Sequence, residues 1–82
     1  MDKEHIIKTI NNLLIQEFEI EAKEITPDAS LKDDLGLESL DFVDIAVSVK
    51  KEFGITPKGN EVASIKIVGY LYDYIYNYDQ KK

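Results

Sequence analysis

The residues best placed to do chemistry lie in one run, DDLGLESLD at 33–41, which turns the chain and delivers Ser39 to the start of a helix. Serine is a favoured N-cap residue, so Ser39 could serve only to accept a backbone hydrogen bond. A hydroxyl at a helix N-terminus has a second use, because free amide donors and the positive end of the helix dipole favour an attached phosphate there. The two interpretations are compatible.

Other groups that could support catalysis are scarce. The chain has no cysteine and a single histidine, His5, in the first predicted helix, where a lone imidazole is expected to be solvated. Carboxylates are plentiful, but 82 residues leave little room for a cleft that desolvates a pair of them. The run 33–36 lacks the alternating oxygen ligands and the terminal glutamate of a calcium loop. We therefore expect neither an enzyme nor a metal site.

The composition indicates one small acidic domain spanning 1–82. With 44% hydrophobic residues and no cysteine, hydrophobic packing must hold a modest core together. A net charge of -6 disfavours nucleic acid and anionic membranes and favours partners with basic patches. No apolar run is long enough to insert into a membrane, and residues 1–5 lack the basic and apolar regions of a secretory signal. We expect a cytoplasmic monomer.

Two predicted helices flank the loop that contains this run. Residues 2–18 carry apolar side chains at helical spacing, namely Ile6, Ile7, Ile10, Leu13, Leu14 and Phe18. From 19 to 37 the periodicity fails and turn residues accumulate, which predicts a loop with room for one helical turn. A connection of this length is uncommon in a compact domain unless it is functional. After Ser39, the segment 40–53 reads as a second helix ended by Gly54.

The second helix carries two apolar stripes. At about 100° per residue, one stripe gathers Phe42, Ile45, Ala46, Val49 and Phe53, and the other gathers Leu40, Val43 and Val47 on nearly the opposite side. One stripe can face the core. The other, edged by Asp44 and Lys51, is predicted to be at least partly exposed and to form a docking surface, unless further helices cover both sides.

The C-terminal third contains a short helix and an ambiguous segment. Residues 60–65 predict the short helix, with Gly59 or Asn60 near its cap. Beyond it, the tyrosines from Tyr70 to Tyr78 alternate at period two, which is a strand signal. The helical template is matched as well, by Val68, Leu71, Tyr72 and Ile75. Because no second strand exists to pair with the segment, we predict a helix with Tyr70, Tyr74 and Tyr76 mostly outward.

These patterns together resemble one known family. The run LGLESLD at 35–41 is similar to the modification motif of acyl carrier proteins, in which Asp-Ser-Leu is usual. Asp44, the run EFGI at 52–55, and Val68-Gly69 with DYI at 73–75 are also similar to that family. The resemblance covers nearly the whole chain. It implies an all-α fold, a small four-helix bundle of the acyl-carrier type with three main helices, one short helix and a long first loop.

The resemblance also implies a function. A phosphopantetheinyl transferase would attach 4'-phosphopantetheine from coenzyme A to Ser39, and the protein would carry acyl groups as thioesters without being an enzyme. Its partners would include acyl-loading and chain-elongating enzymes, such as acyltransferases and ketosynthases of fatty-acid or polyketide synthesis. The partner-binding residues would be Glu38, Leu40, Asp41, Val43, Asp44 and Val47, whose acids attract basic rims and whose apolar side chains give short-range contact.

Two departures from the family pattern point to a specialised carrier. Glu38 replaces the usual aspartate before the serine, and Lys50 and Lys51 stand where carriers of primary fatty-acid synthesis usually present acids. Two alternatives stay open. One is a carrier of aminoacyl or peptidyl groups, and the other is an unmodified protein that uses its acidic face only to bind a partner.

Overall fold

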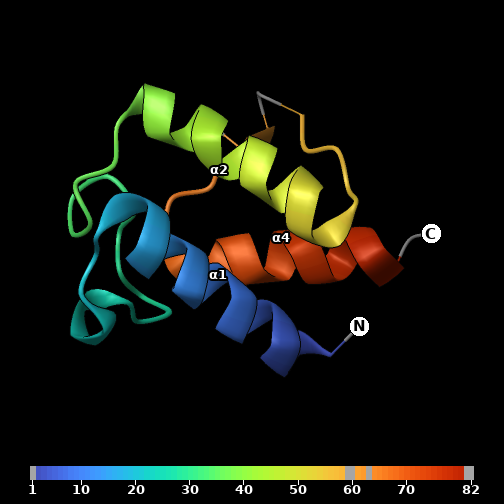
Figure 1. The fold of residues 1–82 in the computed structure, drawn as a ribbon, viewed down its shortest axis with the longest axis horizontal. Coiled ribbons are helices and arrows are strands. Elements are labelled where there is room, and N and C mark those ends of the chain that lie inside the picture. Colours follow the sequence, from blue (N-terminus) through green and yellow to red (C-terminus); the bar gives the residue numbers. More distant parts are fainter. Residues whose placement is uncertain (1, 59–60, 63, 81–82) are drawn as a thin grey trace.

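The fold is all-α, as predicted. The computed structural model describes residues 2–58, 61–62 and 64–80, and these contain the helices α1 (Lys3–Phe18), α2 (Ser39–Phe53) and α4 (Val68–Gln80). A short 3-10 helix, η1 (Ala22–Glu24), is the single turn expected in the first loop. In Figure 1, α1 and α4 run side by side below α2, which crosses the top of the molecule. No helix in these ranges is long and apolar enough to cross a membrane.

The core is one continuous apolar cluster to which α1, α2 and α4 all contribute. The spacing of Ile6, Ile10 and Leu14 places three fully buried side chains along one face of α1. Ile45 and Val49 do the same for α2, one turn apart. Other buried side chains come from the segments between these three helices, namely Ile20, Ala29, Leu31, Leu37, Ile55, Val62 and Ile65. The loops are therefore part of the packed structure, and their conformation is held by burial as well as by turns.

The long first loop is tied to the start of α4 by backbone hydrogen bonds. The N–H of Leu31 donates to the carbonyl of Lys66 at 3.0 Å, and the N–H of Val68 donates to the carbonyl of Ala29 at 3.0 Å. Between them, Ser30 and Ile67 form an isolated antiparallel bridge. This pairing joins parts of the chain that are distant in sequence. It fixes the loop just before the run DDLGLESLD at 33–41, which we call the functional run.

The short helix predicted over 60–65 includes residues 60 and 63, which lie outside the described ranges. Its described neighbours make the hydrogen bonds of a helical turn. The N–H groups of Glu61 and Val62 both donate to the carbonyl of Lys58 at 3.0 Å, and the N–H of Ile65 donates to the carbonyl of Val62 at 3.1 Å.

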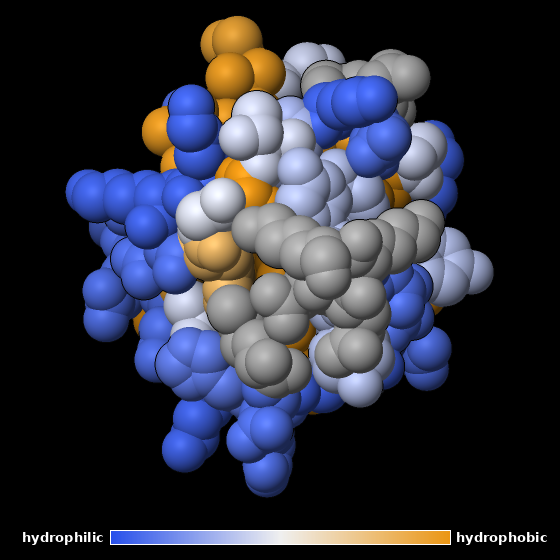
Figure 2. Space-filling view, turned by 90° about the vertical axis from the view of Figure 1, so that its right-hand side faces the viewer, coloured by the Kyte–Doolittle hydropathy of each residue, from blue (hydrophilic) through white to orange (hydrophobic). Residues whose placement is uncertain are grey.

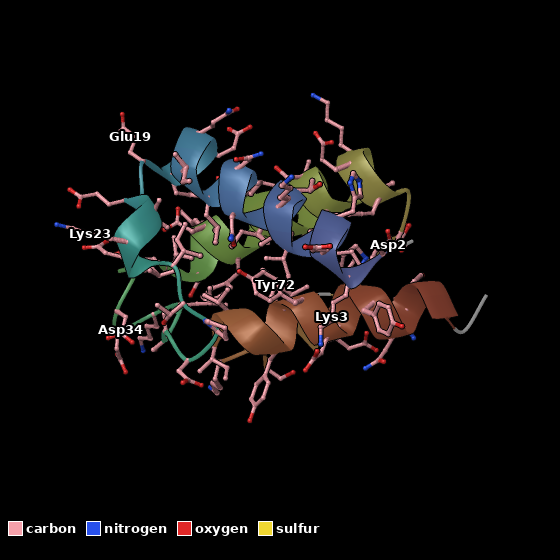
Figure 3. All side chains as sticks on the ribbon, turned by 90° about the horizontal axis from the view of Figure 1, so that it is seen from below. Asp2, Lys3, Glu19, Lys23, Asp34 and Tyr72 are labelled. Carbon is pink, nitrogen blue, oxygen red and sulfur yellow. The ribbon has the colours of Figure 1, made fainter. Side chains whose placement is uncertain are left out.

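The tyrosine-rich C-terminal segment is a helix, so the helical template and not the alternation was the correct guide. Val68, Leu71, Tyr72 and Ile75 are buried on one face of α4. Figure 3 shows Tyr72 between α4 and α1, where its hydroxyl donates to the Asn11 side chain. The choice between helix and strand follows from burial. As a helix, the segment places four apolar side chains on one face that packs against the core, whereas a strand would have no partner strand to pair with.

The outward orientation predicted for three tyrosines is correct for Tyr70 alone. Tyr70 is exposed, whereas Tyr74 and Tyr76 are half-buried and pack against the core. The Tyr74 hydroxyl donates to Glu61 Oε1 at 2.7 Å, which ties α4 to the residues before it. Lys3 at the start of α1 lies 5.9 Å from the centre of the Tyr76 ring and forms an ion pair with Asp73 at 2.7 Å. These partners on neighbouring elements draw the two rings inward.

Tyr74 should make the fold sensitive to alkali. Burial, followed by the hydrogen bond to the Glu61 carboxylate and its charge, raises the pKa of Tyr74 from 10.0 to about 12. The stability that comes from keeping this phenol neutral is therefore complete below pH 10 and is lost as the pH rises from 10 through about 12. Tyr74→Phe should lower the thermal midpoint at pH 7. Above pH 10, the midpoint of this variant should fall less steeply with pH than the midpoint of wild type. A Tyr70→Phe control should behave as wild type, and an equal slope in all three proteins would contradict the assignment.

Candidate functional site

The start of α2 is capped by residues on either side of Ser39. Glu38 is the N-cap residue, with extended backbone angles, and Ser39 is the first residue of the helix. The Asp41 carboxylate accepts a hydrogen bond from the backbone N–H of Glu38 at 2.9 Å. The interpretation of Ser39 as the N-cap is therefore wrong. Its hydroxyl makes no described cap hydrogen bond and is exposed at the positive end of the helix dipole.

The preceding turn positions Ser39 through a buried leucine. Leu37 is 4% exposed, and its N–H donates to the carbonyl of Leu31 at 3.0 Å, so the residue two before the serine is anchored in the core. Gly36 has a φ of 70°, in the left-handed region where glycine carries no steric cost. The N–H of Ser30 donates to the Asp34 carboxylate at 2.7 Å and closes the turn locally. The backbone that leads into Ser39 is thus held in one conformation by the buried Leu37 and by the turn before it.

A cavity of about 610 Å³ opens beside Ser39. Its polar lining residues are Ser30, Lys32, Asp33, Glu38, Ser39 and Lys66, and its apolar lining residues are Leu37, Phe42, Val43, Ala46, Pro57, Val62 and Ile65. Both the loop before α2 and the segment before α4 contribute to the walls. A flexible group attached to Ser39 would therefore meet charged side chains and apolar surface in the same cavity.

The second stripe of α2 is exposed, as predicted. Leu40, Val43 and Val47 are 78%, 59% and 62% exposed, which is unusual for side chains of this size. In Figure 2, hydrophobic atoms stand out at the upper edge of a largely hydrophilic face, and α2 lies along that top edge in Figure 1. The other stripe packs inward, with Ile45 and Val49 buried and Phe42, Ala46 and Phe53 half-buried.

The acidic residues around the stripe do not all face solvent. Asp33, Asp34, Glu38 and Asp44 are exposed, and Asp34 is labelled on the loop in Figure 3. Asp41 is half-buried because its carboxylate caps the helix. Of the two predicted partner-binding aspartates of α2, Asp44 is therefore exposed and Asp41 is only partly accessible.

Asp41→Ala should destabilise the protein. The change removes the acceptor for the Glu38 N–H and an acid from the first turn, and each effect opposes helix formation. We expect a loss of about 1 kcal/mol in the free energy of unfolding, or roughly 4–8 °C in the thermal midpoint for a domain of this size. Asp44→Ala is the matched control on the same helix and should change the midpoint little. Identical midpoints for both variants would exclude the capping role.

Several residues of the cavity were not identified from sequence. Lys66, Val62 and Ile65 lie far from Ser39 along the chain and reach it through the backbone pairing of the first loop with the segment before α4. No short motif marks such a pairing. Lys32 precedes the functional run by one residue, but its place in the cavity wall also depends on that pairing.

Comparison with known proteins identifies the family. Residues 8–75 match a family model described as "Phosphopantetheine attachment site". An "Acyl carrier protein" of Porphyromonas gingivalis is 37% identical over 68 residues, covering 83% of this chain and 87% of the relative. One of Coprothermobacter proteolyticus is 37% identical over 75 residues, covering 92% of each chain. One of Saccharopolyspora erythraea is 32% identical over 71 residues, covering 87% of this chain and 75% of the relative.

The matched residues 8–75 include the first loop, α2 and the segment before α4, and these are the parts of the chain that form the exposed serine and its cavity. The group that such a site holds is 4'-phosphopantetheine. With relatives that match over most of its length, this chain belongs to the acyl carrier protein family, whose members carry acyl groups and are not enzymes.

Proposed function

We propose that Ser39 is the residue that bears the phosphopantetheine arm, and that the protein carries acyl intermediates on that arm between biosynthetic enzymes. The observation that supports this most is the position of the serine. Ser39 is exposed, begins α2 and lines the cavity, while the Asp41 carboxylate is the acceptor of the cap hydrogen bond. Its hydroxyl is therefore available to a modifying enzyme without disturbing the helix.

The residues around Ser39 fit a 4'-phosphopantetheine arm. The arm would be joined to the serine oxygen by a phosphodiester, and the unpaired amides at the start of α2 favour an anion at that place. When bound, the arm supplies a thiol that forms thioesters with acyl groups. The protein's own residues supply position: the anchored turn fixes Ser39, and the apolar part of the cavity offers surface to the arm and its cargo.

Partner choice would come from the exposed face of α2. Leu40, Val43 and Val47 provide apolar contact, and Glu38 with Asp44 attracts basic rims. Asp41 supports this face by holding the helix start. The partners that fit are a phosphopantetheinyl transferase, acyltransferases and ketosynthases. We further propose that 1–82 acts as one monomeric carrier domain in the cytoplasm.

Intact mass spectrometry tests the proposal directly. The purified protein, incubated with coenzyme A and a broad-specificity phosphopantetheinyl transferase, should gain the mass of one arm, and fragmentation should place it on Ser39. The protein isolated from its native cell should carry the same group, and release of the thioester would identify the cargo. A protein that gains no mass under either condition would be an unmodified interaction module, and the proposal would fail.

A further inference from the structure

Two lysines line the same cavity as Ser39. Lys32 comes from the loop before α2 and Lys66 from the segment before α4, and both are exposed. Neither belongs to the exposed stripe of α2, so partner docking on that stripe gives them no role. The charged groups around the cavity are these two lysines with Asp33 and Glu38.

The backbone holds the two lysines close to each other. The carbonyl of Lys66 accepts from the N–H of Leu31, the immediate neighbour of Lys32, at 3.0 Å, and the Ser30–Ile67 bridge flanks that contact. The pairing is anchored by Leu31, which is 1% exposed. In the described ranges the ion pairs are Lys3 with Asp73 and Lys23 with Glu21, and neither Lys32 nor Lys66 takes part in one. The two positively charged lysines thus lie at one cavity, and in the described ranges neither forms an ion pair with a carboxylate.

We propose that Lys32 and Lys66 bind the phosphodiester of the arm on Ser39, an inference that rests on the proposed function. The phosphodiester would be bonded to the serine oxygen, so it would lie at the wall of this cavity, which both flexible lysine side chains also line. A phosphodiester there would otherwise be repelled by Asp33 and Glu38. Two ammonium groups offset that repulsion and add to the positive end of the α2 dipole.

The consequence is a resting position for the arm. Charge-assisted contacts at an exposed cavity mouth are weak and are screened by salt, so they hold the root of the arm against the cavity without locking it. A partner with its own basic rim can then take over the phosphate. The run DDLGLESLD contains acids and no base. Lys32 precedes it by one residue, and the fold adds Lys66 from the segment before α4.

Phosphorus NMR of the arm-bearing protein with a free thiol tests the proposal, because the phosphodiester is then the only anion that the arm contributes. The variants are Lys32→Gln with Lys66→Gln, and the control is Lys8→Gln with Lys50→Gln, which removes the same charge from exposed lysines that do not line this cavity. Intact mass first shows that each protein carries the arm. Circular dichroism then shows that each is folded.

Wild type and control should show a broad phosphorus resonance that narrows and shifts as salt is added. The cavity variant should show a narrow resonance at low salt that salt no longer moves. A resonance of equal width and position in all three proteins would overturn the proposal. So would equal spectra that separate only after loading with an acyl group that has a terminal carboxylate, since the lysines would then serve the cargo. If no protein gains the arm, the mass spectrum shows that the proposed function itself has failed.

Discussion

Ser39→Ala should gain no mass from coenzyme A and a phosphopantetheinyl transferase, while its helical circular dichroism and thermal midpoint stay close to those of wild type. The loss is expected to be complete, because the substitution removes the only oxygen to which the arm could be joined at this position. The fold should persist because the helix start is capped by Asp41, and Ser39 is exposed. Exposed substitutions of this kind usually change stability by less than about 0.5 kcal/mol.

The matched control is Ser48→Ala, on the same helix. Ser48 is half-buried and lines a different groove, between α1 and α2, so the variant should be modified at the wild-type rate. The pair separates the role of one hydroxyl from the effect of losing any serine of α2. A full mass gain in Ser39→Ala would assign the arm to another residue, and a large fall in its thermal midpoint would mean that the hydroxyl also stabilises the helix.

Much of the fold follows from local patterns. The apolar spacing of residues 2–18 and 40–53 predicts α1 and α2 within a residue of their observed bounds, because each helix buries one face in a common core. Gly54 ends α2 in the left-handed conformation, as its position suggested. The exposure of Leu40, Val43 and Val47 was also predictable, since two opposed apolar stripes on one helix cannot both face so small a core.

The site was only partly predictable, for a physical reason. Ser39 and the exposed stripe are encoded within a few helical turns, so spacing alone finds them. The cavity wall that contains Lys66 depends on hydrogen bonds between the first loop and the segment before α4, and such long-range pairing leaves no periodic signal. The capping role of Asp41 could not be predicted because several carboxylates lie near the start of α2. Only the three-dimensional geometry shows which of them accepts from the Glu38 N–H.

The charges on the exposed face of α2 differ between its two ends. Leu40, Asp44, Val47 and Lys51 follow one another at spacings of three and four, so they lie on one side of the helix. Along this side of the helix, Asp44 therefore lies nearer the serine end and Lys51 at the far end, with Val47 between them and Leu40 before the acid. A partner that presents a base, an apolar patch and an acid in the same order would match it in one orientation only.

Asp44→Lys should accordingly slow modification and acyl loading by basic partners roughly two- to thirtyfold at low salt, because it converts an attraction into a repulsion, each modest for exposed groups. The effect should shrink as salt rises, since such charges are screened over about 10 Å at 0.1 M. Lys51→Glu should also slow a partner that matches this face, because it sets an acid against the acid that such a partner presents at the far end.

Asp28→Lys is the control, because it makes the same change in net charge at an exposed turn outside this face. Asp44 is exposed and accepts no described cap hydrogen bond, which is accepted by Asp41 instead, so the variant should remain folded. Initial rates measured against ionic strength, with thermal melts alongside, decide the matter. If Asp44→Lys and Asp28→Lys slow the partners equally at every salt concentration, net charge alone steers them and α2 offers no oriented docking face.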